Sequence, residues 1–238
     1  TWRSAVQIRP PQPSFMLEII VDFIDSYQLS RINRFIRKFK IDTIIDVGAH
    51  KGDFIKHALK NLKPKKIYAF EPQKGISCIL KKRFKKKVKV FDLAIGKKNS
   101  YNLIFINKLK KTSTLNSNII YSNSIFNKFK NLLLLQKGNY ESKYDVKTVS
   151  LDYFFSKKRF FRTLLKIDVE GYEMNVLLGS KKILKEIQIV LIEKQNLKKN
   201  NFHKCHELLL KSNFIHFKTF LFPLMHFEDR LYVKKELI

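Results

Sequence analysis

The segment IDTIIDVGAHKG, residues 41–52, joins a short apolar run to a turn that contains two glycines. Ile41 to Val47 has the length and composition of a buried β-strand, and Gly52 to Leu62 has the apolar spacing of a helix. A turn this short needs glycine where the backbone takes unusual angles or approaches a ligand, here at Gly48 and Gly52. The segment therefore predicts a strand, a tight turn and a helix whose first N–H groups are open to a ligand.

Strand and helix signals continue to alternate beyond this segment, with Pro64 ending the first helix. Further strands are expected at residues 66–70, 88–91, 103–106, 164–169, 187–192 and 214–220, and helices at 73–84, 172–178 and 202–210. A last strand at 231–233 is expected at the sheet edge, and residues 97–147 are irregular enough to predict an insertion. This alternation is typical of an α/β fold, a mostly parallel, Rossmann-like sheet with helices on both faces.

The ends of the chain differ from this pattern. Residues 1–15 hold three prolines and no apolar period, which predicts a disordered leader or a misassigned start with Met16 as the first residue. Residues 16–40 predict a basic amphipathic helix, and residues 41–238 the main domain. The apolar stripe of the helix carries Ile32, Phe35, Ile36 and Phe39. Such a stripe more often covers a core sheet than lies on an anionic membrane, which stays the alternative.

Composition sets limits on the class of protein. A hydrophobic share of 45% and 21 Phe residues indicate a folded chain despite a net charge of +28. That charge suits a polyanion or an anionic membrane, but a general enrichment in Lys, Asn, Ile and Phe explains it as well. Cys78 and Cys205 cannot form a disulfide framework, which favours a reducing, cytoplasmic location. No apolar run approaches the roughly 20 residues of a membrane helix.

An acidic residue at the end of the second strand, Glu71, suggests a nucleoside cofactor. It lies at about the distance downstream of the glycine turn that is expected for a carboxylate that binds a ribose diol. The Gly-x-Gly-x-x-Gly pattern for a pyrophosphate is missing, because His50 stands at the place of the second glycine. A cofactor without phosphates is therefore favoured.

At this point the chain resembles the FkbM family of methyltransferases. The resemblance rests on seven segments in the family's order: IDVGAHKG at 45–52, FEP at 70–72, AIG at 94–96, TSTL at 112–115, VSLD at 149–152, LKIDVEGYE at 165–173 and VLIE at 190–193. The match covers roughly residues 41–195, and the LKIDVEGYE block is its most specific part.

The resemblance implies a class I methyltransferase fold, S-adenosyl-L-methionine as methyl donor, and a hydroxyl acceptor on a sugar, glycan or secondary metabolite. Gly48 and Gly52 would border the methionine part of the donor, Glu71 the ribose, and the segment around Ala94 the adenine. The full set of expected cofactor-binding residues is Asp46, Gly48, Ala49, His50, Gly52, Glu71, Pro72, Ala94 and Asp168. Many relatives carry Asn where this chain has His50.

Four residues are candidates for accepting the proton of the acceptor hydroxyl. They are Asp168, Glu170, Glu193 and His50. The alternative for each is a structural role in capping a helix or binding main chain. Glu173, one turn into the next helix, is a weaker candidate. The run Asp168-Val169-Glu170-Gly171 lacks the Asp/Asn-Pro-Pro-aromatic pattern that enzymes methylating an exocyclic amine carry here, so an oxygen acceptor is favoured.

Metal sites and other functions are expected less. His203 and His206 lie three residues apart without a third ligand, so no structural zinc is predicted. Mg²⁺ at Asp168 and Glu170 is an alternative without a dedicated set of oxygen ligands. An RNA or another polyanion is the second choice of acceptor, and a non-catalytic cofactor-binding module is the third interpretation. Neither the acceptor nor an oligomeric state follows from the sequence.

Overall fold

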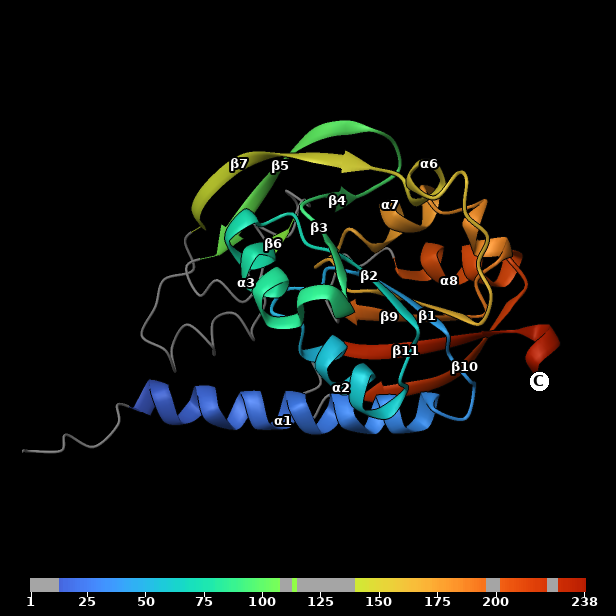
Figure 1. Cartoon of the computed structure of the whole chain (residues 1–238), viewed down its shortest axis with the longest axis horizontal. Coiled ribbons are helices and arrows are strands. Elements are labelled where there is room, and N and C mark those ends of the chain that lie inside the picture. The colour runs from blue at the N-terminus through green and yellow to red at the C-terminus, as the bar shows by residue number, and fades with distance from the viewer. Residues whose placement is uncertain (1–12, 108–112, 115–139, 196–201, 222–226) are drawn as a thin grey trace, which may run out of the picture.

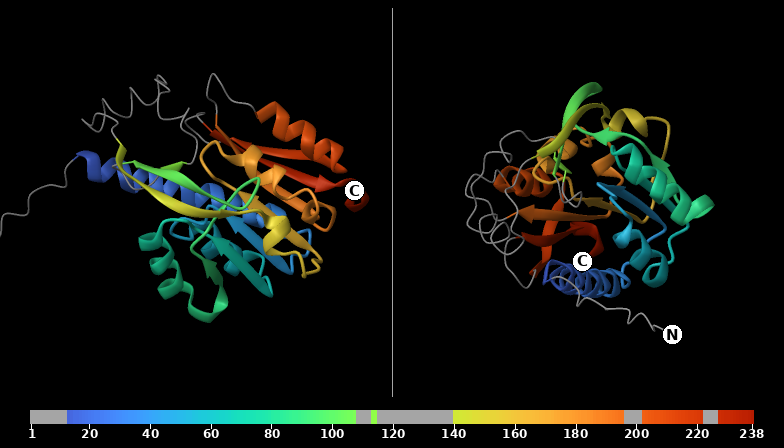
Figure 2. Two further views of the ribbon diagram at one scale, coloured as in Figure 1. Left: turned by 90° about the horizontal axis from the view of Figure 1, so that it is seen from above. Right: turned by 90° about the vertical axis from the view of Figure 1, so that its left-hand side faces the viewer.

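The computed structural model of the chain describes residues 13–107, 113–114, 140–195, 202–221 and 227–238 (Figure 1). Their strands form a seven-stranded sheet in the order β10-β11-β9-β8-β1-β2-β3 and a four-stranded sheet in the order β4-β7-β5-β6. Helices cover the larger sheet, and the smaller sheet lies on the side of the molecule opposite α1 (Figure 2).

The strands of the larger sheet are β1 (Thr43–Val47), β2 (Lys66–Phe70), β3 (Lys89–Phe91), β8 (Thr163–Ile167), β9 (Ile189–Gln195), β10 (Phe214–Leu221) and β11 (Phe227–Lys234). Those of the smaller sheet are β4 (Ala94–Ile95), β5 (Ser100–Asn107), β6 (Ser113–Thr114) and β7 (Tyr140–Val149). The helices are α1 (Pro13–Ile36), α2 (Asp53–Asn61), α3 (Lys74–Phe84), α6 (Leu151–Phe154), α7 (Glu173–Leu178) and α8 (Phe202–Lys211), with short 3-10 turns η1 (Lys85–Lys87), η2 (Ile183–Lys185) and η3 (Lys235–Leu237).

The centre of the larger sheet is parallel, as the alternation of strands and helices predicts. β1 pairs in parallel with β2 on one side and β8 on the other, and β9 continues the parallel run beyond β8. The predicted bounds of these elements agree with the structure to within a few residues, and β2 agrees at both ends. Because parallel strands end at one edge of the sheet, the residues that follow β1, β2 and β8 meet there.

The prediction that the last strand lies at the sheet edge is wrong. β11 pairs antiparallel with β9 on one side and with β10 on the other, so β10 is the edge strand. The reason is burial: Leu231, Tyr232 and Val233 are 0% exposed, and a strand buried on both faces needs a neighbour on each side. This placement brings Asp229 opposite Glu193 on β9.

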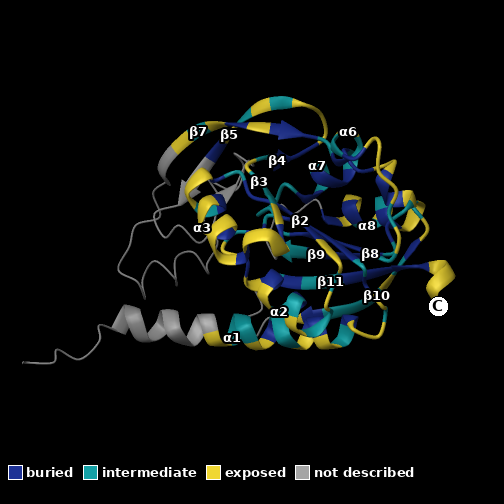
Figure 3. Ribbon diagram, viewed as in Figure 1, coloured by how far each residue is buried: buried dark blue, intermediate teal, exposed yellow. Residues whose placement is uncertain are grey.

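The core has two halves because side chains alternate between the two faces of each strand. On one face, residues such as Ile45 and Leu165 pack against α6, α7 and α8. On the other face, residues such as Ile44 and Leu164 pack against α1, α2 and α3. Figure 3 shows the strands of the sheet as the most buried part and α3 as largely exposed on its outer side.

Helix α1 covers the sheet, as its apolar stripe favours. It runs from Pro13 to Ile36 and so ends before the predicted limit at residue 40. Ile32 and Ile36 are fully buried, and the ring of Phe35 lies 5.5 Å from that of Phe220 on β10. Residues 1–12 of the predicted leader lie outside the described residues. No helix in the described part of the chain combines the length and apolarity that crossing a membrane requires.

The predicted insertion, residues 97–147, contains β5, β6 and most of β7 of the smaller sheet, while β4 precedes it. β5 includes the strand expected at residues 103–106 and pairs antiparallel with β7, while β4 pairs in parallel with the end of β7. Ile104 and Val146 are buried on the inner face of this sheet beside Ala94. Residues 108–112 and 115–139 of the predicted insertion lie outside the described residues.

Candidate active site

The turn after β1 brings two segments of backbone into contact. Gly48 and Gly52 both have φ of 82°, and His50, the middle residue of the three between them, has φ of 45°. A Cβ atom added to Gly48 would overlap the carbonyl oxygen of Asp168, and one added to Gly52 would overlap the ring of Phe84. Side chains are strained at such positive φ values, so both positions require glycine. Gly48 thus seats the turn against the residue that follows β8, and Gly52 seats it against α3.

Glu71 ties the turn after β1 to the end of β2. Its two carboxylate oxygens accept the backbone N–H groups of His50 and Gln73, each at 2.9 Å. Glu71 is 3% exposed, and this burial raises the pKa of its carboxyl group to about 7, against the lowering effect of the two hydrogen bonds. Its carboxylate therefore lies at the glycine turn, where the ribose of a nucleoside was expected.

A buried lysine of the LKIDVEGYE segment, which was not among the predicted site residues, lies at the centre of the site. The Nζ atom of Lys166 on β8 is 3.0 Å from Oδ2 of Asp168, 3.3 Å from Oδ1 of Asp46 and 3.4 Å from the carbonyl oxygen of Gly48. Burial alone would lower the pKa of Lys166, but the charges of Asp168 and Asp46 and the bond to Asp168 raise it overall. The lysine is therefore a permanent cation between two predicted site residues.

Sequence does contain a signal for Lys166. It is a lysine inside an apolar strand, and residues two apart on a strand share a face, which places it on the side of Asp168. Its partner Asp46 stands directly across from it in the β1–β8 register. Asp46 is 0% exposed, and burial raises the pKa of its carboxyl group while Lys166 lowers it.

Three of the four predicted proton acceptors converge at the ends of β8 and β9. One carboxylate oxygen each of Asp168, Glu170 and Glu193 lies within 4.8 Å of the others. Burial raises the pKa of Glu193 well above its usual value, and the neighbouring charges of Asp168 and Glu170 add to the rise. Like charges this close disfavour full ionisation of the group, which is the second reason for the raised pKa of Glu193.

Asp229 and Glu173 extend this acidic group. Burial raises the pKa of Asp229 to about 7, with a further contribution from Asp168. Burial likewise raises the pKa of Glu173 to about 7, while its Oε1 accepts the N–H of Gly171 at 2.8 Å. That bond gives Glu173 a structural role in the turn after β8, in line with its lower rank among the candidates. No local sequence signal marks Asp229, because its position depends on β11 lying beside β9.

The remaining predicted residues lie around this centre at different places. Ala49 is buried, its N–H donates to the carbonyl of Phe70 at 3.1 Å, and Pro72 follows Glu71 directly. His50 lies in the turn itself, half-buried. Ala94 is on the other sheet, where it packs beside Ile104 and Val146. The structure thus gathers the turn, Glu71 and the carboxylates, with Ala94 to one side.

The residues present fit a cationic nucleoside donor. Neither carboxylate oxygen of the fully buried Asp46 accepts a hydrogen bond among the described residues, and Oδ1 lies 3.3 Å from Nζ of Lys166. The carboxylates outnumber the single lysine, so the centre of the site is acidic although the whole chain is strongly basic. By ligand type and spacing, Asp168, Glu170 and Glu193 are also the described residues that could bind a divalent cation. The absence of a metal remains a prediction.

Comparison with known proteins identifies what the chain is similar to. A family model described as the methyltransferase FkbM domain matches residues 46–222, which include both the glycine turn and the carboxylate group. No curated protein matches the chain.

Solved structures of methyltransferases share the architecture. Magnesium protoporphyrin IX methyltransferase from Synechocystis PCC 6803 with bound SAM has a TM-score of 0.51 and 6% sequence identity, and the match covers 90% of this chain and 82% of that chain. An rRNA methylase from Streptococcus thermophilus has a TM-score of 0.48 and 12% identity, with 86% and 94% covered. Identities this low bear on the fold alone. The expected Rossmann-like class I methyltransferase fold is confirmed.

Proposed function

The chain belongs to the methyltransferase FkbM family, and from that membership we propose that it methylates a hydroxyl group of a sugar, glycan or secondary metabolite. It is a methyltransferase whose donor is S-adenosyl-L-methionine. The proposed domain that performs the transfer is residues 41–238, with 16–40 as a covering helix. The free thiols of Cys78 and Cys205 suit a reducing compartment, and the proposed location is the cytoplasm.

The donor would be bound by the residues around the glycine turn. S-adenosyl-L-methionine supplies a methyl group on a positively charged sulfur. Glu71 keeps lone pairs free beside its two backbone bonds, and these can accept the hydroxyl groups of a ribose. Gly48 and Ala49 lie in the turn, Pro72 would contact the donor beside Glu71, and the segment around Ala94 would border the adenine. Asp46 and Asp168 supply negative charge that complements the sulfonium.

The acceptor hydroxyl would lie beside the carboxylates at the ends of β8 and β9. Methyl transfer is an in-line displacement at carbon, so the protein has to align the two reactants and to accept the hydroxyl proton. Among the four candidates, Glu193 suits the second task best, since a raised pKa makes its ionised form a stronger base. Asp168 and Glu170 would orient the hydroxyl group.

The observation that carries the proposal is the contact between the two motifs. The Gly48 turn, which begins the donor site, lies directly against the backbone of Asp168, which begins the carboxylate group. The proposed donor and acceptor sites would therefore share one wall, as a direct transfer requires.

The donor site is tested by calorimetry with a matched pair of variants. Gly48→Val should abolish binding of S-adenosyl-L-methionine, because its side chain would overlap Asp168 in a backbone conformation that Val does not adopt. Gly75→Ala is the control, since a Cβ at Gly75 on α3 meets no atom within 4 Å. Full binding by a folded Gly48→Val protein would contradict the proposed donor site.

The acceptor is tested by transfer of label. The protein would be incubated with methyl-labelled donor and separate fractions of glycans, metabolites, lipids and RNA. Label in a base-stable ether of a glycan or metabolite is expected for an oxygen acceptor. Label on nitrogen or carbon, or in the RNA fraction alone, would contradict the proposal.

A basic cavity favours a second candidate, a polyanion acceptor such as RNA. A cavity of about 620 Å³ between α2 and η1 is lined by Lys56, Arg83 and Lys85–Lys87. Binding to several phosphates should weaken steeply as salt rises, and competition by unrelated polyanions should fail if the site is specific. The third interpretation, a non-catalytic module, predicts donor binding without transfer to any fraction.

A further inference from the structure

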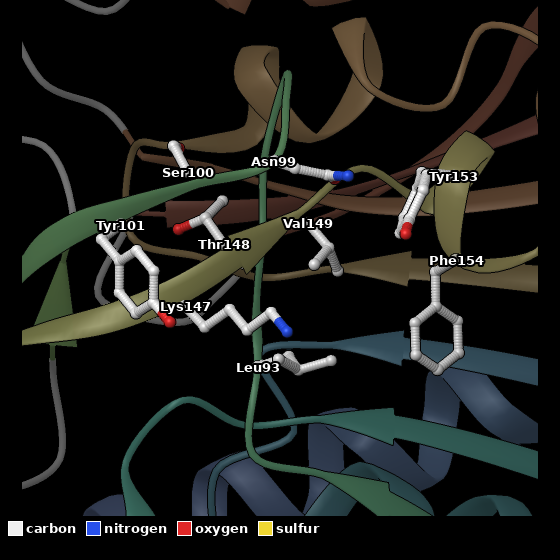
Figure 4. A pocket seen from close by; sticks show the side chains of 9 residues that line it. All are labelled: Leu93, Asn99, Ser100, Tyr101, Lys147, Thr148, Val149, Tyr153 and Phe154. Atoms are coloured by element: carbon white, nitrogen blue, oxygen red, sulfur yellow. The ribbon is translucent and has the colours of Figure 1, made fainter.

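A second cavity lies outside the donor site, where the smaller sheet meets α6. It has a volume of about 480 Å³. Its floor is apolar, with Leu93, Val149 and the ring of Phe154 (Figure 4). Phe154 is held in place by the rings of Phe70 and Phe91, at 5.0 and 4.8 Å between centroids. The floor is therefore continuous with the core and rigid.

Two tyrosines stand at opposite ends of this cavity. Tyr101 projects from β5 and Tyr153 from α6, and Figure 4 shows the space between them. Their side chains are 73% and 65% exposed, which is high for aromatic rings. Exposed aromatic rings that flank an apolar floor are typical of a binding site, since they offer large flat contact areas at little cost in conformational entropy.

Polar groups occupy one rim of the cavity. Asn99 and Ser100 lie there, whereas Thr148 is only 1% exposed. Oδ1 of Asn99 accepts the N–H of Ser150 at 3.2 Å, which fixes the amide group at the rim. Asn102 donates to the hydroxyl oxygens of Ser100 and Thr148 at 2.8 and 2.9 Å, so the O–H groups of both remain able to donate. A ligand here meets hydrogen-bond donors on one side and hydrocarbon on the other.

The charge of the cavity is positive. Lys147 on β7 lies opposite Tyr101 in the strand register, and its side chain extends between the two tyrosines (Figure 4). The residues that line the cavity include no acidic side chain. Because the whole chain has a net charge of +28, long-range attraction also favours an anionic ligand.

The cavity is close to the proposed active site but separate from it. A Cβ atom added to Gly96 would lie 2.8 Å from Cγ2 of Thr148, at the cavity rim, and 3.2 Å from Cε1 of Tyr172. Tyr172 belongs to the same turn as Asp168 and Glu170. Gly96 thus packs between Thr148 and the segment that carries the carboxylates, so the cavity and the proposed active site are neighbours in the fold.

We propose that the cavity binds an acidic sugar unit of the acceptor, so that the acceptor is an anionic glycan. This rests on the proposed function and deepens it. A sugar ring has a face of C–H groups for the tyrosines and apolar floor, a rim of hydroxyl groups for Asn99 and Ser100, and a carboxylate or sulfate for Lys147. A nucleobase, which would stack on the face of a single tyrosine ring, is the alternative ligand, and the uridylate oligomer in the test below distinguishes it.

The proposal is tested by calorimetric titration of the full chain with three probes. They are a galacturonic acid oligomer, the same oligomer with its carboxyl groups methyl-esterified, and a uridylate oligomer of equal length. The wild-type protein should bind the acidic oligomer at least about tenfold more tightly than the esterified one. Tyr153→Ala and Lys147→Gln should each lose at least about tenfold in affinity for the acidic oligomer. Both changes are at exposed side chains, so folding is expected to persist.

Two matched controls separate the cavity from general charge and exposure. Phe161→Ala removes an aromatic ring that is 70% exposed elsewhere, and Lys60→Gln removes an exposed lysine on α2. Both should bind the acidic oligomer as the wild type does. Equal losses in controls and cavity variants, equal binding of the esterified oligomer, or tighter binding of the uridylate oligomer through Tyr153 would each overturn the proposal.

Titration with S-adenosyl-L-methionine distinguishes this inference from the function on which it rests. Donor binding without binding of the acidic oligomer would refute the cavity proposal and leave the methyltransferase proposal standing. Binding of the acidic oligomer without donor binding would contradict the proposed donor site and leave the affinity of the cavity for acidic sugars standing.

Discussion

Replacing Lys166 with Met would test the charge balance on which the active site depends. The side chains of Lys166 and Asp46 are only 9% and 0% exposed, and their charged atoms are 3.3 Å apart. At that distance the attraction is about 5 kcal/mol for an effective dielectric constant of about 20, before the cost of desolvation. Removing one partner leaves the other charge buried without compensation, and we expect a loss of about 3–5 kcal/mol in the free energy of unfolding.

This loss should depend on pH with a defined sign. Burial already raises the pKa of Asp46, and Lys166 opposes that rise, so Lys166→Met raises the pKa further. A carboxyl group whose pKa is raised by folding stabilises the protein most below its unfolded pKa and loses that contribution as pH rises through its folded pKa. The deficit of Lys166→Met should therefore shrink from about pH 8 to about pH 5, as measured by urea unfolding.

A double-mutant cycle with Asp46→Asn isolates the pair. Asn keeps the shape of Asp46 but carries no charge, so the double variant should recover much of the stability that Lys166→Met loses. The expected coupling energy is about 2–3 kcal/mol. A coupling below about 0.5 kcal/mol, or a deficit of equal size at both pH values, would refute the assigned ion pair.

Three further predictions concern catalysis and local structure. Glu193→Gln should lower kcat by about 10²–10⁴-fold. It should also remove the rise of kcat/KM with pH that the raised pKa of Glu193 predicts for the wild type. An unchanged pH profile would exclude Glu193 as the base. Glu71→Gln should cost about 1–3 kcal/mol in urea unfolding, because the amide of Gln faces a backbone N–H of His50 or Gln73, and stability equal to the wild type would contradict the two hydrogen bonds. Gly75→Ala should leave donor affinity unchanged and raise stability by about 0.5–1 kcal/mol, which thermal unfolding would measure.

Most of the elements were predictable because their signals are local. An apolar run such as residues 41–47 is enough to predict a strand buried on both faces. The spacing of Phe54, Ile55 and Ala58 is enough to predict a helix with one apolar face. The glycine turn was predictable for the same reason, because glycine stands at both positions of the turn, 48 and 52, where φ is 82°. The use of α1 followed from its stripe, with Ile32 and Ile36 in the core.

The position of the last strand was not predictable from local signals. Residues 231–233 are apolar whether the strand lies at an edge or inside the sheet. Its insertion between β9 and β10 depends on which neighbours remain unpaired after the parallel strands have formed. Asp229 joined the acidic group only through that choice, so the sequence alone did not indicate it.

The amino-acid sequence by itself determined the family, the order of strands and helices, and the residues at the carboxyl ends of β1, β2 and β8, because periodicity and glycine placement act over a few residues. Only the tertiary structure decided that Lys166 lies between Asp46 and Asp168, that Asp229 faces Glu193, and that Tyr101 and Tyr153 flank a cavity. Distances between side chains on different strands depend on strand order and register, and these are set by burial of the whole core.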